Sequence, residues 1–147
     1  MVTYEVVHEW MAQVNLFVFL FVLTGLVVLS IVLQRKRKFV WHGNTMLVIV
    51  MIASLLTVVH MGPSLAWVVV ETLSEFNLVA FLGVIHGFIG LVTIVIGVWL
   101  VGAWAFAGSS ETGFCAPKRK LMWKIVTLWI VAMALGLAYY PLHLILG

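Results

Sequence analysis

The chain has 147 residues, of which 65% are hydrophobic and 9% are charged. A soluble globular chain is usually about half apolar and about a quarter charged, so this composition excludes an ordinary soluble domain. It also excludes a disordered chain, which needs low hydrophobicity, and a disulfide scaffold, because the sequence holds one cysteine. The chain is therefore expected to be an integral membrane protein, with room for roughly four spans of about 20 residues each.

The charged residues predict how the chain crosses the membrane. The eight Lys and Arg residues form two clusters, at 35–38 and at 118–120 with Lys124, and four of the five glutamates lie in segments that alternate with these clusters. Because basic loops stay in the cytoplasm, both clusters are predicted inside, and the N-terminus and C-terminus are both predicted outside. The fold class that follows is an all-α, integral membrane four-helix bundle.

The apolar runs predict one transmembrane domain over residues 1–147. Gly62 and Pro63 predict a helix end or kink at the close of the second run. The segment 64–76 is interpreted as an amphipathic helix on the outer surface, and a kinked continuation of the second span is the less favoured alternative. The predicted spans cover, in chain order, about residues 13–34, 43–61, 78–106 and 121–144.

Three of the five histidines are predicted at one outer level of the membrane. His60 lies 18 residues from His42, His86 lies 20 residues from Phe106, and His143 lies 23 residues from Lys120. At the helical rise per residue these separations from the inner helix ends are ~27, ~30 and ~34 Å. An ionisable side chain inside a membrane is costly, so we take these three histidines as the candidate metal ligands.

The sequence around His86 favours a flat ligand. Gly83 and Gly90 lie at i−3 and i+4 from His86 and leave its helix face without side chains. Tyr139 and Tyr140 lie one helical turn before His143 and are candidate cofactor-binding residues. Two imidazoles from facing helices are what a b-type haem in a bundle requires, so haem b is the first candidate cofactor. Copper is the alternative, and a quinol is a further candidate.

Other interpretations of the same residues remain open. A glycine stripe in a membrane helix more often packs against another helix than against a cofactor. A single histidine near a membrane interface is more often a hydrogen-bonded interfacial residue than a ligand, so His8 and His42 are the weaker metal-ligand candidates. The sequence lacks nucleotide-binding and hydrolase motifs, and we therefore do not expect an enzyme that acts on its own. The basic clusters indicate topology and lipid contact, and no nucleic acid is expected.

The order of these features resembles a family of small four-helix bacterial and archaeal membrane proteins of unknown function, which includes the cytochrome oxidase assembly protein CtaM. The resemblance covers most of the chain from about Arg35. The family often has a further histidine before the basic start of the last helix, where this chain has Ala116 and Pro117. The segments that carry the resemblance are RKRKFVWHGNTML with His42, LLTVVHMGPS with His60, FLGVIHGFIGLVTIVIGVWL with His86, KRKLMWKIVTLWIVAMALG, and YYPLHLIL with His143.

The resemblance implies a role near haem–copper respiratory oxidases in the plasma membrane of a prokaryote. Three functions follow as hypotheses. The first is a b-type haem protein of respiratory electron transfer, or an accessory subunit of a respiratory membrane complex, with its site near the outer surface. It would serve a membrane quinol and an outer-side redox protein. The second is an assembly factor that handles haem or copper for an oxidase, and the third is a purely structural membrane subunit.

Overall fold

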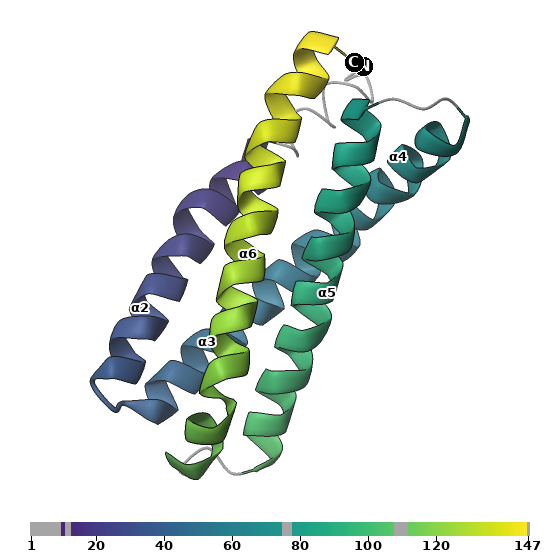
Figure 1. The fold of residues 1–147 in the computed structure, drawn as a ribbon. Coiled ribbons are helices and arrows are strands. Elements are labelled where there is room, and N and C mark those ends of the chain that lie inside the picture. The colour runs from purple at the N-terminus through teal and green to yellow at the C-terminus, as the bar shows by residue number, and fades with distance from the viewer. Residues whose placement is uncertain (1–9, 11–12, 75–77, 108–111, 147) are drawn as a thin grey trace.

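The computed structural model describes residues 10, 13–74, 78–107 and 112–146, and this part of the chain is helical and contains no strand. The all-α bundle predicted from the composition is therefore confirmed (Figure 1). The elements, in which η denotes a π-helix, are η1 (Val18–Leu23), α2 (Thr24–Arg35), α3 (Phe39–Leu56), η2 (Thr57–Met61), α4 (Gly62–Ser74), α5 (Leu78–Phe106) and α6 (Thr112–Leu146).

Four helical stretches within the described residues are long and apolar enough to cross a membrane. They are Gln13–Arg35, Phe39–Ala66, Leu78–Phe106 and Pro117–Tyr139. Between 6% and 22% of the residues in the most apolar window of each stretch are buried inside the protein. Large apolar side chains such as Val58, Phe88 and Phe106 are exposed instead. In a chain of this composition such an outer surface indicates a multi-pass membrane protein whose helices contact lipid.

The turn between α2 and α3 is a Schellman motif. The Lys38 N–H donates to the Leu33 carbonyl at 2.9 Å, and the Arg37 N–H donates to the Gln34 carbonyl at 3.0 Å. Arg37 has a φ of 56°, a left-handed conformation that this motif usually assigns to glycine. Because the turn is so short, α2 and α3 form a tight antiparallel hairpin.

The second span continues into α4 without a loop. The π-helix η2 joins α3 to α4, and the Gly62 N–H donates to the Thr57 carbonyl five residues earlier. Pro63 has no N–H to donate, yet the helix runs on to Ser74. The backbone of 64–74 thus has the continuing helix that the sequence made the less favoured alternative. The placement of this segment on the outer surface stays a prediction.

The helices pack around α5, which contacts α3, α4 and α6, while α2 packs on α3. A small apolar core of Leu23, Ile49 and Ala53 lies between the first two spans. The end of α2 and the start of α6 lie at the same end of the bundle, which we call the basic end because it carries both cationic clusters (Figure 1). This is the arrangement that alternating charges predict; that the basic end faces the cytoplasm stays a prediction.

The start of α6 differs from the predicted span and is held against its neighbours by a lysine. The helix begins at Thr112 rather than near 121, so it includes the basic cluster that the sequence placed before the span. The Lys118 ammonium lies 3.7 Å from the ring centroid of Phe114 and 5.1 Å from that of Trp99 on α5. The cation–π contact with Trp99 connects the basic cluster of α6 to α5.

Candidate functional site

His86 is fixed by a hydrogen bond between two spans. Its Nδ1 atom lies 2.8 Å from the carbonyl oxygen of Ala132 on α6. A carbonyl oxygen only accepts, so Nδ1 carries the proton and donates, and the neutral ring then has its free lone pair on Nε2. A histidine held in this way has a defined tautomer and a defined ring direction, which are the properties of a prepared ligand.

Gly136 gives the His86 ring the space for this contact. A Cβ atom added to Gly136 would lie 2.9 Å from His86 Cε1 and 3.4 Å from Nε2. No specific role for Gly136 follows from the sequence. In the structure, its lack of a side chain leaves room for the imidazole of His86, which comes from α5. The hydrogen bond and the glycine together make the α5–α6 contact specific at this level of the bundle.

The predicted glycine stripe on α5 is divided between packing and open space. Gly83 is buried, and a Cβ at the neighbouring Gly87 would meet the side chain of Leu65 from α4. A Cβ at Gly90 would meet no atom within 4 Å. The chain therefore uses part of this stripe for its own packing and leaves bare backbone at Gly90, one turn from His86.

The other outer candidates are placed only in part. His60 lies in η2 and Tyr139 lies on α6, and both are half-buried. His8 and the side chains of Tyr140 and His143 lie outside the described residues. Within the described part of the chain, no three His, Cys, Asp or Glu side chains form a group that could hold a metal ion. The shared site of His60, His86 and His143 therefore stays a prediction.

His42 is hydrogen-bonded, as an interfacial histidine would be, but it is buried between helices. It is 7% exposed, whereas the neighbouring Trp41 is 67% exposed. Its Nδ1 lies 2.9 Å from the carbonyl oxygen and 2.7 Å from the hydroxyl oxygen of Ser30 on α2. Because the carbonyl only accepts, Nδ1 again carries the proton and Nε2 carries the lone pair. The tight hairpin brings these two residues together.

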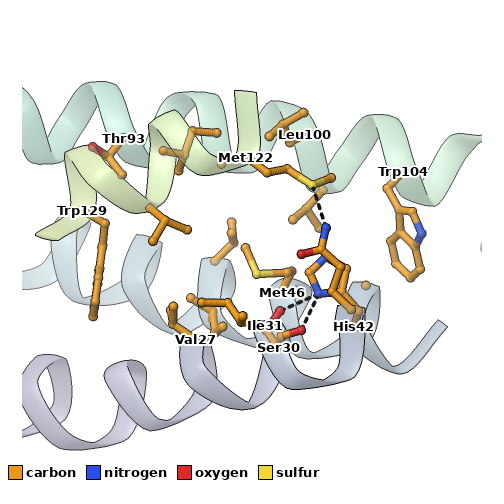
Figure 2. A pocket seen from close by; sticks show the side chains of 18 of the residues that line it. Val27, Ser30, Ile31, His42, Met46, Thr93, Leu100, Trp104, Met122 and Trp129 are labelled. Atoms are coloured by element: carbon orange, nitrogen blue, oxygen red, sulfur yellow. Dashed lines mark hydrogen bonds between the residues drawn. The ribbon is translucent and has the colours of Figure 1, made fainter. Parts of the chain in front are cut away.

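A cavity of about 120 Å³ lies beside His42, between α2, α3, α5 and α6 (Figure 2). Most of its lining is apolar, including Met46, Trp104, Met122 and Trp129. The buried polar side chains of the described residues are Ser30, His42 and Thr93, and all three line this cavity. All three are hydrogen-bonded within the protein, His42 to Ser30 and Thr93 to the Ile89 carbonyl, which offsets the cost of burying them in an apolar interior.

No candidate role for Ser30, Thr93, Met46 or Met122 follows from the sequence. A signal for Ser30 is present, because it is a polar residue within an apolar run. It lies five residues before the 35–38 turn, and His42 lies four residues beyond it. In an antiparallel helical hairpin, residues at similar distances from a short turn lie close together. Thr93 and Met122 come from other spans, and only the packing of the bundle brings them to His42.

Comparisons of the chain with protein-family models, with curated proteins and with solved structures gave no match. The resemblance to the small four-helix family therefore stays a prediction. The structural features that bear on function are two fixed imidazoles, His86 on α5 and His42 on α3, and the cavity beside His42.

Proposed function

We propose that the protein is a small b-type haem-binding membrane protein that acts in respiratory electron transfer or as an accessory subunit of a respiratory membrane complex. In this proposal His86 would be one ligand of the haem iron, and His60 or His143 would be the other. The observation that carries the proposal is the 2.8 Å hydrogen bond from His86 Nδ1 to the Ala132 carbonyl. Metal-binding histidines usually donate their second ring N–H to such an acceptor.

The surroundings of His86 fit a flat apolar group. The backbone is bare at Gly90, on the same face of α5 and one turn away, because a Cβ there would meet nothing within 4 Å. Neutral imidazole is the usual protein ligand of haem iron, and one or two such ligands suffice. Haem is favoured because the bare backbone at Gly90 fits a flat group beside His86, and copper is the alternative. When bound, haem supplies one-electron transfer.

The experiment is optical spectroscopy of the full chain, expressed with a supply of haem and purified in detergent. We expect a reduced-minus-oxidised b-type spectrum and haem in a pyridine assay. His86→Gly should abolish the spectrum, and added imidazole should restore part of it by occupying the space of the missing ring. His60→Leu and His143→Leu identify the second ligand, because only one of them should remove the low-spin spectrum.

The matched control is His42→Gly, which removes a buried imidazole near the basic end of the bundle, away from His86. This variant should keep the haem spectrum if His86 is the ligand. A wild-type protein that takes up no haem would overturn the proposal. A spectrum that persists in His86→Gly without added imidazole would overturn the role of His86.

A further inference from the structure

The two cationic clusters meet at the basic end of the bundle. We call residues 35–38 the hairpin cluster, and 118–120 with Lys124 the α6 cluster. Gln34, next to the hairpin cluster, reaches α6, where its Nε2 donates weakly to the sulfur of Met122 at 3.9 Å. Met122 lies between Lys120 and Lys124 in the sequence. One contact therefore joins the segments that carry the two clusters, at the shared end of α2 and α6 (Figure 1).

The described segments at this end supply the cations with no acidic partner. The sequence has no Asp, and Glu111, just before α6, lies outside the described residues. The described segments around the two clusters contain no Glu; they are 30–46, 97–107 and 112–124. All the cations of both clusters except Lys118 are exposed. Because like charges repel one another, such a concentration of exposed cations favours an anionic partner.

Both clusters lie at the ends of membrane-spanning stretches, which is the level of lipid headgroups. Arg35 is the last residue of the first stretch, and the fourth stretch, Pro117–Tyr139, begins at the α6 cluster. Trp41 and Trp123, beside the clusters, are 67% and 45% exposed, and indole rings concentrate at membrane–water interfaces. The anion that a membrane offers at this level is the phosphate of a lipid, and basic clusters at span ends attract it.

The clusters belong to different pairs of helices. The hairpin cluster connects α2 to α3, which pack together, and the α6 cluster lies on a helix that packs on α5. Backbone hydrogen bonds from Arg37 and Lys38 close the hairpin turn, so its position is fixed. A ligand that carries two anionic groups on a short linker can contact both clusters at once. Its second contact is then intramolecular and gains from a high effective concentration.

We propose that the basic end binds a diphosphatidylglycerol lipid (cardiolipin), with one phosphate at the hairpin cluster and the other at Arg119 and Lys120 of the α6 cluster. Exposed apolar side chains deeper on the same helices, such as Val28 on α2 and Ile130 on α6, suit its acyl chains. A lipid with one phosphate reaches one cluster at a time and binds more weakly. The bound lipid ties the α2–α3 pair to the α5–α6 pair. This inference rests on the cationic clusters and not on the haem proposal.

The test measures lipid binding to the full chain in a neutral detergent by titration and native mass spectrometry. The probes are tetraoleoyl cardiolipin, dioleoyl phosphatidylglycerol and the zwitterionic dioleoyl phosphatidylcholine. Inorganic pyrophosphate is a soluble source of two joined phosphates. Cardiolipin should bind at least about tenfold more tightly than phosphatidylglycerol, because two linked contacts exceed two separate ones. Phosphatidylcholine and pyrophosphate should bind more weakly still, since the first has no net charge and the second has no acyl chains.

Paired substitutions in each cluster locate the lipid. Lys36→Gln/Lys38→Gln and Arg119→Gln/Lys120→Gln each change two exposed side chains, so both variants should fold. Each should lower the affinity for cardiolipin at least about tenfold, since one cation near an anionic lipid is worth about fivefold. Each should also bring that affinity close to the affinity for phosphatidylglycerol, because one cluster remains.

Two controls separate charge from other effects. Lys36→Arg/Lys38→Arg keeps both charges and should bind cardiolipin as the wild type does. Lys118→Gln removes a cation of the α6 cluster whose ammonium lies on the rings of Phe114 and Trp99. This variant should keep the preference for cardiolipin over phosphatidylglycerol, because the Lys118 charge is already engaged.

Several outcomes would overturn the inference. Equal affinities for cardiolipin and phosphatidylglycerol at the same phosphate concentration would show that the clusters act separately. Unchanged cardiolipin binding in either glutamine variant would show that one lipid does not bridge the two clusters. Pyrophosphate binding as tightly as cardiolipin would assign the site to a soluble phosphate. His86→Gly should bind cardiolipin as the wild type does, so a failure of the haem proposal and a failure of this one are distinguishable.

Discussion

The imidazole of His86 lies against the backbone of Gly136, and its Nδ1 reaches the Ala132 carbonyl one turn earlier on the same helix. The two contacts depend on each other, because the hydrogen bond requires a ring position that any side chain at Gly136 would obstruct. These two contacts join the third and fourth spans at one depth. They also set the direction of His86 Nε2, the ring nitrogen that can still accept a hydrogen bond.

Gly136→Ala should displace the His86 ring. The added methyl group would come within 2.9 Å of Cε1, and the strained or lost hydrogen bond should lower the free energy of unfolding by about 1–3 kcal/mol. Thermal unfolding in detergent, followed by circular dichroism, measures the effect. Gly102→Ala is the control, since it makes the same change in open space. Equal melting temperatures for the two variants would contradict this account.

Gly43→Ala should be destabilising because of Trp104. A Cβ at Gly43 would overlap the indole of Trp104, which is buried against α3. Overpacking of this kind costs about 1–3 kcal/mol. The cost should nearly vanish in a Trp104→Leu background, so a double-mutant cycle isolates the contact. Gly25→Ala, with no atom within 4 Å of the added Cβ, is the control. Additive effects in the cycle would rule out a direct clash.

Arg37→Gly should stabilise the hairpin between α2 and α3. Arg37 has a φ of 56°, and a residue with a side chain pays about 1 kcal/mol for this conformation relative to glycine. Arg35→Gly removes the same charge from the last residue of α2 and should lower stability instead, because glycine is a poor helix former. Urea or thermal titrations in detergent compare the two. A loss of stability in Arg37→Gly would contradict the prediction.

Cysteine labelling should place both basic clusters on the cytoplasmic side. In a Cys115→Ser background, Lys36→Cys and Arg119→Cys lie at the same end of the bundle. A membrane-impermeant maleimide should react with both positions in inverted vesicles and with neither in intact cells, because basic loops stay inside. Reaction of the two positions from opposite sides would contradict the four-span arrangement.

The spans could be predicted closely because apolar length is a local property of the sequence. The third span is the clearest case, since the expected bounds of 78–106 are those of α5, Leu78–Phe106. The helix boundaries outside the apolar segments are harder to predict from the sequence. The sequence predicts a helix end or kink at Gly62-Pro63. The helix does not end there but continues through η2, where the Gly62 N–H donates to the Thr57 carbonyl five residues earlier.

Depth is the one property of the candidate site that the sequence addresses. The rise per residue predicts His86 at an outer level, which stays a prediction, and nothing local to His86 indicates Ala132 or Gly136 as its partners, since these come from another span. The burial of His42 follows from the register of a hairpin, and the sequence instead suggested an interfacial residue. The cavity needed all four helices, because Thr93 and Met122 reach it from α5 and α6.

The π-helix η2 also controls which side of α4 faces the bundle. A π-turn holds one residue more than an α-turn, and each residue turns a helix by about 100°. Leu65 reaches Gly87 on α5 with that extra residue in place. Deleting one residue between Thr57 and Met61 would leave the composition and apolar length of the span nearly unchanged while turning Leu65 away from α5. The orientation of α4 relative to α5 thus depends on a single extra residue in η2.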